Sequence, residues 1–279
     1  MKKRVISALL AVLAVVSFIL PALATGVAET LPKSYVYLDG VPQSVEYEIR
    51  NCTTYVTVSS FVPMADPQAV VNEWNGVVYV NSASATQETL SMTISTQVPF
   101  IVANDRCLYA KDSITIVNGR VAMPVRFLAS LFNLDVNYDA ALNAVMLTHV
   151  QGRSAYIQPG GSYYNADSLY WLSRIIYKES GNQVLEGKIA VGNVVMNRVN
   201  SPLFPNNIYD VLNQPNQFVS TDILSAWTPN NESVVAAKLV LEGVQVVPTA
   251  LFFAQAGLTC YASIYRPYVT TIGGHAFYA

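Results

Sequence analysis

The periodicity of the sequence changes at residues 151–167, QGRSAYIQPGGSYYNAD, and this change limits the folds open to the chain. Glycine, serine and proline interrupt every regular pattern there. Before this stretch apolar and polar residues alternate as in strands, whereas after it apolar residues recur at helical steps of three and four. A chain of 279 residues is long enough for two domains. We therefore expect a β-rich module over residues 25–150, a linker over 151–164 and a second domain over 165–279.

The β-rich half is predicted from runs of β-branched and aromatic residues at period two. These runs are residues 34–40, 53–61, 76–82, 89–96 and 113–125. One helix is expected at 125–133, VRFLASLFN, followed by a strand pair over 134–150.

The β-rich half contains an internal sequence repeat. YVTVSSF at 55–61 resembles AMPVRFL at 122–128, and each precedes a short helical or irregular stretch, a polar turn and a final strand. A duplicated strand–helix–hairpin unit is therefore expected. Together with the residues DG at 39–40 and VNGRVAMPVRFLASLFNLDVNYDAALNAVMLT at 117–148, the duplication resembles the copper amine oxidase N-terminal-like domain of secreted cell-envelope proteins. The resemblance implies a binding or spacer role and no bound metal.

The second half is predicted to be an α+β domain. Long helices are expected within 166–180 and 184–200, and a short one within 204–213. A further helix is expected to open at Thr228 and Pro229 and to close at Gly243. The last two apolar segments, 249–257 and 265–279, are predicted to be strands of one small antiparallel sheet.

Residues 1–24 have the three parts of a signal peptide. MKKR is basic, VISALLAVLAVVSFIL is apolar, and PALA ends in a small-x-small cleavage pattern. The apolar run is short for a membrane span, for which about 20 residues are needed. We expect a mature chain without a membrane span that begins near Thr25 and is secreted to the cell wall or spore envelope.

The charge balance of the expected mature chain disfavours nucleic acid and anionic membranes as partners. Without Lys2, Lys3 and Arg4, 13 of the 16 basic residues remain against 18 acidic ones, so the net charge is near −5. Polyanions select basic surfaces. The abundant tyrosine and small polar residues are better suited to carbohydrate.

The cysteines and histidines indicate no metal site or cofactor. Cys52, Cys107 and Cys260 show no paired metal-ligand spacing, and His149 and His275 are the only histidines. Two interpretations of the cysteines stay open: Cys52 and Cys107 form a disulfide in an oxidising compartment and leave Cys260 free, or all three are small buried thiols.

Glu179 is the acid for which the sequence supplies no ordinary structural role. It continues the apolar stripe of Leu169, Leu172 and Ile176 at helical spacing, and Gly181 provides a helix stop. An apolar wall raises the pKa of a carboxyl, as a general acid requires. Lys178 is expected to face away from it. The alternative is a core acid satisfied by backbone donors of the next helix.

The remaining acids of this half have simpler explanations. Glu186 is expected in the first turn of the second long helix, where a carboxylate favours the helix dipole. The others are expected at helix ends, on the short helix (Asp210) or in a loop (Asp222); they are Asp167, Asp210, Asp222, Glu232 and Glu242.

Several motifs in order make this half similar to the catalytic domain of the SleB/CwlJ family of cell-wall hydrolases, the spore-cortex-lytic enzymes of germination. They are Y-x-E at 177–179, EGKIAVGNVVMNRV at 186–199, FPNNIYDV at 204–211, QPNQF at 214–218 and IGGHAFYA at 272–279. The resemblance implies a lysozyme-like α+β fold and an enzyme that cuts peptidoglycan glycan strands with one catalytic acid, Glu179. This chain has Asn182-Gln183 where the family usually has Gly-Glu, and Gln255-Ala256 where it has Asn-Pro.

One acid is sufficient for a lytic transglycosylase, whereas most glycosidases pair two carboxylates. We therefore expect a lytic transglycosylase or muramidase in which Glu179 acts first as acid and then as base. Glu186 is the candidate for a second acid. Tyr177, Gln217, Phe218 and His275 are the expected substrate-binding residues.

Two other functions stay open. The chain could be a non-catalytic wall- or spore-coat-binding protein that keeps the fold, which the departures at Gln183 and Gln255 favour. It could also be an amidase in which His275 deprotonates Cys260. Spore cortex and vegetative wall are not distinguished by the sequence, nor is a need for muramic lactam.

Overall fold

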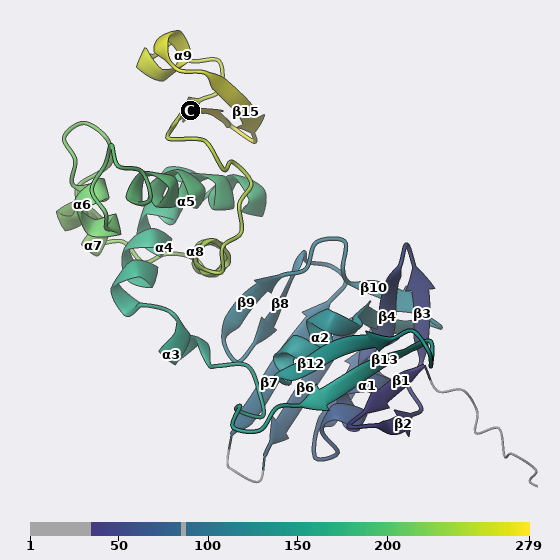
Figure 1. Ribbon diagram of the computed structural model, residues 1–279. Coiled ribbons are helices and arrows are strands. Elements are labelled where there is room, and N and C mark those ends of the chain that lie inside the picture. Colours follow the sequence, from purple (N-terminus) through teal and green to yellow (C-terminus); the bar gives the residue numbers. More distant parts are fainter. Residues whose placement is uncertain (1–34, 85–87) are drawn as a thin grey trace, which may run out of the picture. The chain divides into compact units, whose positions relative to one another are not determined.

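The computed structural model describes residues 35–84 and 88–279 (Figure 1). The predicted signal peptide lies outside the described residues. Within the described ranges, no helix combines the length and apolar character needed to cross a membrane.

Three sheets build the N-terminal module (Figure 1). The first has the order β12-β13-β1-β2, with β1 (Val36–Leu38), β2 (Val41–Gln43), β12 (Leu134–Asp139) and β13 (Ala144–His149). The second has the order β10-β11-β4-β3, with β3 (Tyr47–Arg50), β4 (Thr53–Thr57), β10 (Thr115–Val117) and β11 (Arg120–Pro124). The third follows chain order, with β5 (Val70–Trp74), β6 (Val77–Ala83), β7 (Thr89–Ser95), β8 (Phe100–Ala103) and β9 (Arg106–Tyr109).

The strands form where the sequence alternates and turn where it supplies Asn-Gly. Val78 and Val80 of β6 are fully buried while their neighbours are more exposed, as period two requires. Asn75-Gly76 and Asn118-Gly119 both have positive φ at each residue, which suits the tight hairpins they close. β1 pairs in parallel with β13, so the two ends of the module lie in one sheet.

One strand prediction in this module was wrong at its end. The run 53–61 is a strand only to Thr57, because Val58–Ala65 form helix α1. Val58, Phe61 and Val62 are fully buried at helical spacing, and this packing outweighs the preference of the β-branched residues for strands. Strands β2, β3, β8 and β9 were not predicted.

The expected helix at 125–133 is α2 (Val125–Leu131). The order strand, helix, two strands occurs twice, as β4-α1-β5-β6 and as β11-α2-β12-β13. An origin of this order by duplication stays a prediction.

The C-terminal half is helical, with a small sheet at its end, which confirms the predicted α+β class. The helices are α3 (Gly160–Tyr163), α4 (Ala166–Ser180), α5 (Leu185–Val199), α6 (Ile208–Leu212), α7 (Thr221–Ser225), α8 (Asn231–Leu241) and α9 (Tyr261–Tyr265). The sheet has the order β14-β16-β15, with β14 (Phe252–Gln255), β15 (Tyr268–Ile272) and β16 (His275–Tyr278).

Helices α4, α5 and α8 pack against one another at Gly192. A Cβ atom there would lie 2.9 Å from Cδ1 of Ile176 on α4 and 2.9 Å from Cγ2 of Val240 on α8. Any side chain at position 192 would therefore force its neighbours to move. Glycine lets the three helices approach closely.

Polar side chains of α5 hold the segment that leads to the small sheet. Asn193 is fully buried; its amide donates to the Val244 carbonyl at 2.7 Å and accepts from the Val246 N–H at 2.8 Å. Asn197 donates to two more carbonyls of this segment, and Arg198 Nε donates to the Leu251 carbonyl at 2.7 Å. These bonds satisfy an irregular backbone that would otherwise be buried without partners.

Two local predictions in this half need correction. Helix α8 starts at Asn231 instead of Pro229, because the side chain of Asn230 accepts from the Ser233 N–H at 2.9 Å and caps the helix. Asp222 lies in the first turn of α7 and not in a loop.

The two halves also share packing and one buried ion pair. Arg106 of β9 donates through Nε and Nη2 to the two carboxylate oxygens of Glu242, the C-cap of α8, at 2.8 and 2.7 Å. The Tyr164 hydroxyl donates to the same carboxylate at 2.7 Å. Glu242 was expected to need only a capping or solvent role, but it links the N-terminal module to the helical half. The boundaries at 150 and 165 stay predictions.

The proposed Cys52–Cys107 disulfide is not formed, since both cysteines are free. Cys52 is exposed in the turn between β3 and β4, whereas Cys107 is buried on β9, where burial raises the pKa of its thiol to about 11. Cys107 belongs to the same apolar cluster as Leu172 and Leu239 of the helical half.

We predict that Glu242→Gln destabilises the protein by roughly 3 kcal/mol, because it leaves the guanidinium of Arg106 buried without a counter-charge. The side chains of Arg106 and Glu242 are only 12% and 7% exposed. Glu48→Gln breaks an ion pair with Arg50 whose side chains are 44% and 39% exposed, so solvent screens the pair and the loss of stability should be much smaller. Urea unfolding of both variants tests this; equal losses would contradict the assigned role.

Candidate active site

Glu179 lies in an open pocket of about 780 Å³ that three separate segments of the C-terminal half build. The end of α4 and the turn after it supply Tyr177, Lys178, Glu179, Gly181, Asn182 and Gln183. The segment before α8 supplies Trp227 and Asn230, and the small sheet supplies Gln255, Gly274 and His275. Residues far apart in sequence thus meet around one carboxyl.

The environment of Glu179 is that of an acid able to keep its proton. The side chain is half-buried at the last turn of α4, and within residues 35–84 and 88–279 its carboxyl forms no hydrogen bond that would stabilise the charged form. Burial raises the pKa of Glu179, and the nearby Lys178 ammonium opposes this to a smaller extent. The alternative of a core acid satisfied by the next helix is therefore not what the structure shows.

Lys178 was expected to face away from Glu179, but it lines the same pocket. Its ammonium lies 4.3 Å from the ring centre of Trp227, in the geometry of a cation–π contact. The Tyr177 ring also contacts Trp227, with ring centres 6.0 Å apart. The contact with Trp227 explains why the cation stays at the pocket wall.

The turn between α4 and α5 is fastened from two sides. The Gly274 N–H donates to Gln183 Oε1 at 2.8 Å, which ties the turn to the small sheet. The Lys188 ammonium donates to the Gln183 backbone carbonyl and pairs with Glu232 at 2.6 Å. The Lys188 side chain is 1% exposed, so the turn between α4 and α5 is held by a buried cation.

His275 begins β16 opposite Gln255 and closes the other side of the pocket. Its ring packs edge-on against Phe253, with ring centres 5.3 Å apart. Burial lowers the pKa of His275, which favours the neutral imidazole. Nδ1 is buried and has no hydrogen-bond partner in the described part of the chain.

Of the four expected substrate-binding residues, the structure brings Tyr177 and His275 to the pocket but not Gln217 and Phe218. Gln217 is exposed. Phe218 packs on Phe253 at 6.3 Å and faces the buried guanidinium of Arg198 at 4.9 Å. Phe218 therefore supports the wall behind His275.

The second-acid candidate, Glu186, lies in the first turn of α5 and is exposed. It is not among the residues that line the pocket. Within the lining, Glu179 is the only carboxylate.

The Cys260–His275 pair of the amidase hypothesis is not assembled. Cys260 caps α9 and packs against Ala276 and Tyr278 of β16. The His275 ring instead contacts Phe277, which lies between those two residues on the strand. Alternate residues of a strand face opposite sides of the sheet. Cys260 and His275 therefore lie on opposite faces.

Trp227, Asn230 and Lys178 are the pocket residues that sequence reasoning did not select. Trp227 and Asn230 flank the residues TP that were assigned to the start of a helix. An aromatic residue and an asparagine in an exposed loop before a helix are the pattern that suggests sugar contacts. The described residues contain no group of three or more histidine, cysteine or acidic side chains able to hold a metal ion.

Two stretches of the chain match known family models. Residues 182–278 match the family model described as Cell Wall Hydrolase. The C-terminal region is a cell wall hydrolase domain. Residues 35–147 match the model described as Copper amine oxidase N-terminal domain. The cell wall hydrolase match begins just after Glu179, so the role of that residue rests on the pocket itself.

Relatives of the cell wall hydrolase domain are named spore cortex-lytic enzymes. The chain is 30% identical over 121 residues to that of Bacillus subtilis, which is 43% of this chain and 39% of the relative. It is 28% identical over 116 residues to that of Oceanobacillus iheyensis, which is 41% of this chain and 42% of the relative. The match thus spans about two fifths of the length of these relatives.

Two solved structures are also similar to part of the chain. They are the catalytic domains of the germination-specific lytic transglycosylase SleB from Bacillus anthracis and of SleB from Bacillus cereus, both 28% identical with a TM-score of 0.39. Each is covered completely, over 44% and 47% of this chain.

We predict that Lys188→Met loosens the turn at residues 181–183 without unfolding the cell wall hydrolase domain. Met fills the buried space, but the Gln183 carbonyl loses its donor. Hydrogen exchange at the Gly274 amide, which is bonded to Gln183, should become about ten-fold faster, a change of roughly 1.4 kcal/mol in local opening. Lys238→Met is the matched control, because Lys238 pairs with Asp105 instead. Equal protection of Gly274 in both variants would contradict this role.

Proposed function

We propose that the chain is a peptidoglycan-cleaving enzyme of the lytic transglycosylase type, with Glu179 as the single catalytic residue. The observation that carries this proposal is the composition of the pocket, in which one half-buried carboxyl with a raised pKa has no acidic neighbour in the lining. A hydrolase of the usual two-carboxylate kind needs a second acid about 5 to 10 Å away.

The reaction uses Glu179 twice. The protonated carboxyl donates its proton to the glycosidic oxygen, and the bond between that oxygen and C1 of muramic acid breaks with its electrons on the oxygen. The carboxylate then accepts the proton of the muramic acid C6 hydroxyl while O6 bonds to C1. The products are a free hydroxyl on the leaving sugar and a 1,6-anhydro ring, so protons and electrons balance without water.

The rest of the pocket suits an N-acetylated sugar. Trp227 and Tyr177 offer aromatic faces against which the C–H face of a sugar ring packs. Asn182, Asn230 and Gln255 supply amide groups that match hydroxyls and acetamides. His275 also lines the pocket and presents a neutral imidazole to it.

The departures from the family pattern are compatible with catalysis. Gln183 binds the Gly274 N–H through its side-chain oxygen, so its place in the pocket wall is structural. Gln255 lies at the rim, opposite His275. Neither replaces the acid, which favours the enzyme over a non-catalytic wall-binding protein. By analogy with the relatives, the substrate is the glycan of spore cortex or cell wall, reached after export directed by residues 1–24.

We expect Glu179→Gln to lower glycan cleavage by at least about 10³-fold, because the amide has the shape of the acid but no proton to transfer. Release of anhydromuramic ends from purified sacculi, followed by mass spectrometry, measures this. The variant should still fold and bind sacculi.

The matched control is Glu186→Gln, which removes an exposed carboxylate outside the pocket and should keep near-normal activity. If Glu179→Gln were active and Glu186→Gln inactive, the catalytic acid would be Glu186 on α5 and the assignment of Glu179 would be wrong. Reducing ends in place of anhydro ends would indicate a muramidase.

The raised pKa of Glu179 also predicts how stability depends on pH. The unfolded chain loses this proton near the ordinary glutamate pKa of about 4.3, whereas the folded chain keeps it to higher pH. The folded state therefore binds more protons in this window, and the contribution of Glu179 to stability falls as pH rises. The free energy of unfolding of Glu179→Gln minus that of wild type should grow from about pH 4 to neutral pH, as urea titrations can measure. A constant difference would show that the pKa is unshifted.

A further inference from the structure

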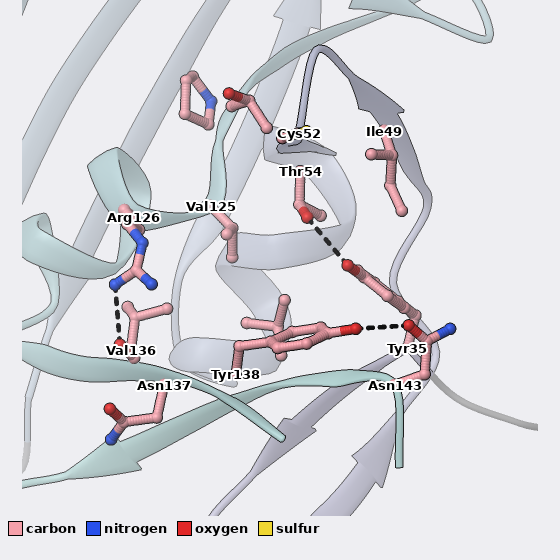
Figure 2. A pocket seen from close by; sticks show the side chains of 13 residues that line it. Tyr35, Ile49, Cys52, Thr54, Val125, Arg126, Val136, Asn137, Tyr138 and Asn143 are labelled. Carbon is pink, nitrogen blue, oxygen red and sulfur yellow. Dashed lines mark hydrogen bonds between the residues drawn. The ribbon is translucent and has the colours of Figure 1, made fainter. Parts of the chain in front are cut away.

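A second pocket of about 480 Å³ lies on the N-terminal module and is not explained by the proposed reaction. Figure 2 shows its wall, to which the β12–β13 hairpin contributes Tyr138 and Asn143, the β3–β4 region contributes Thr54, and the start of α2 contributes Arg126. Tyr35, just before β1, closes one end. The volume is in the range of small-molecule sites.

Two tyrosine rings in this pocket are held in fixed orientations. The Tyr35 ring stacks on Tyr47, with ring centres 4.6 Å apart, and its hydroxyl lies 3.3 Å from Thr54 Oγ1. The Tyr138 hydroxyl donates to Asn143 Oδ1 at 2.5 Å, although the side chain is 53% exposed (Figure 2). A rigid, exposed aromatic ring binds a ligand at a low cost in conformational entropy.

Arg126 supplies the only charge among the lining residues. Its Nη1 donates to the Val136 carbonyl at 2.8 Å, which holds the guanidinium at the wall and leaves its other N–H groups for a ligand (Figure 2). No acidic side chain lines the pocket to neutralise it. A guanidinium held in this way favours a carboxylate.

Asn143 adds an amide to the same wall. Its Oδ1 accepts from the Tyr138 hydroxyl, and in the described part of the chain its Nδ2 forms no hydrogen bond. A free amide N–H is the donor that the carbonyl of an acetamide group complements.

We propose that this pocket binds a carboxylate-bearing N-acetylated amino sugar, the muramic acid unit of wall glycan from which the stem peptide has been removed, so that its lactyl carboxylate is free. The sugar ring packs against Tyr138, its acetamide bonds Asn143, and its lactyl carboxylate pairs with Arg126. The choice of this ligand rests on the proposed function, because that function makes wall glycan the polymer the chain meets. Two separate glycan contacts on one chain would raise its affinity for an insoluble polymer through effective concentration.

Co-sedimentation of the full chain with purified sacculi from which an amidase has removed the stem peptides tests this, with Glu179→Gln in every protein so that the glycan stays intact. Tyr138→Ala and Arg126→Gln should each weaken binding about ten-fold, and Tyr138→Phe, which keeps the ring, should bind more tightly than Tyr138→Ala. Tyr79→Ala and Arg120→Gln are matched controls, because both residues are exposed on the same module outside this pocket. Unchanged binding in Tyr138→Ala and Arg126→Gln would overturn the proposal.

The identity of the carboxylate is tested by comparing these sacculi with untreated sacculi, in which the lactyl carboxyls are amide-linked to the stem peptides. Weaker binding to untreated sacculi that no longer depends on Arg126 supports the lactyl group. Binding to untreated sacculi that is as tight and depends equally on Arg126 overturns the lactyl assignment. In competition, N-acetylmuramic acid should displace the protein at lower concentration than N-acetylglucosamine, and equal potency would also contradict it.

Failure of the reaction and failure of the pocket can be told apart. Tyr138→Ala in the otherwise unaltered chain should cleave short soluble glycans at the normal rate. If the unaltered chain cleaves nothing while sacculi binding depends on Tyr138 and Arg126, the proposed function is wrong and the pocket stands. If cleavage is normal and the binding of sacculi depends on neither Tyr138 nor Arg126, the pocket assignment alone is wrong.

Discussion

The close packing of α4, α5 and α8 at Gly192 determines where the candidate active site forms. The last turn of α4 carries Glu179, and the segment that enters α8 carries Trp227 and Asn230. Because the crossing has no room for a side chain at position 192, the positions of these two segments are coupled. A half-buried acid beside an aromatic wall is a consequence of that geometry, and the raised pKa follows from the loss of solvent around the carboxyl.

The third wall of the pocket depends on polar contacts. The side of α5 that carries Asn193, Asn197 and Arg198 holds the irregular segment before β14 and so positions the small sheet. The Lys188 ammonium and the Gln183 side chain then connect this sheet to the α4–α5 turn. Hydrogen-bonded polar groups in a buried position restrict a structure to one arrangement, and a cleft that must hold a proton at a defined atom needs such restriction.

The N-terminal module is joined to the helical half by interactions that resemble a protein core. The Arg106–Glu242 pair is nearly desolvated, and Tyr164 donates to the same carboxylate. Cys107 and partly buried residues of β8 and β9 belong to the apolar cluster of the helices. A module packed in this way can present its own pocket to the polymer on which the second half is proposed to act.

The sequence by itself determined the two-part organisation, the α+β class, the boundaries of α4 and α5 to within a residue, and Glu179 as the acid of interest. These depend on local signals: periodicity, Asn-Gly turns, a glycine at a helix end, and an acid on an apolar stripe. Only the tertiary structure decided that Trp227, Asn230 and Lys178 share the pocket, that Gln217 and Phe218 do not, and that Cys260 and His275 lie on opposite faces of a sheet. It also showed that Glu242, which was expected only at a helix end, is a buried partner of Arg106. Such contacts join residues tens of positions apart, and their energies depend on burial, which a linear pattern does not contain.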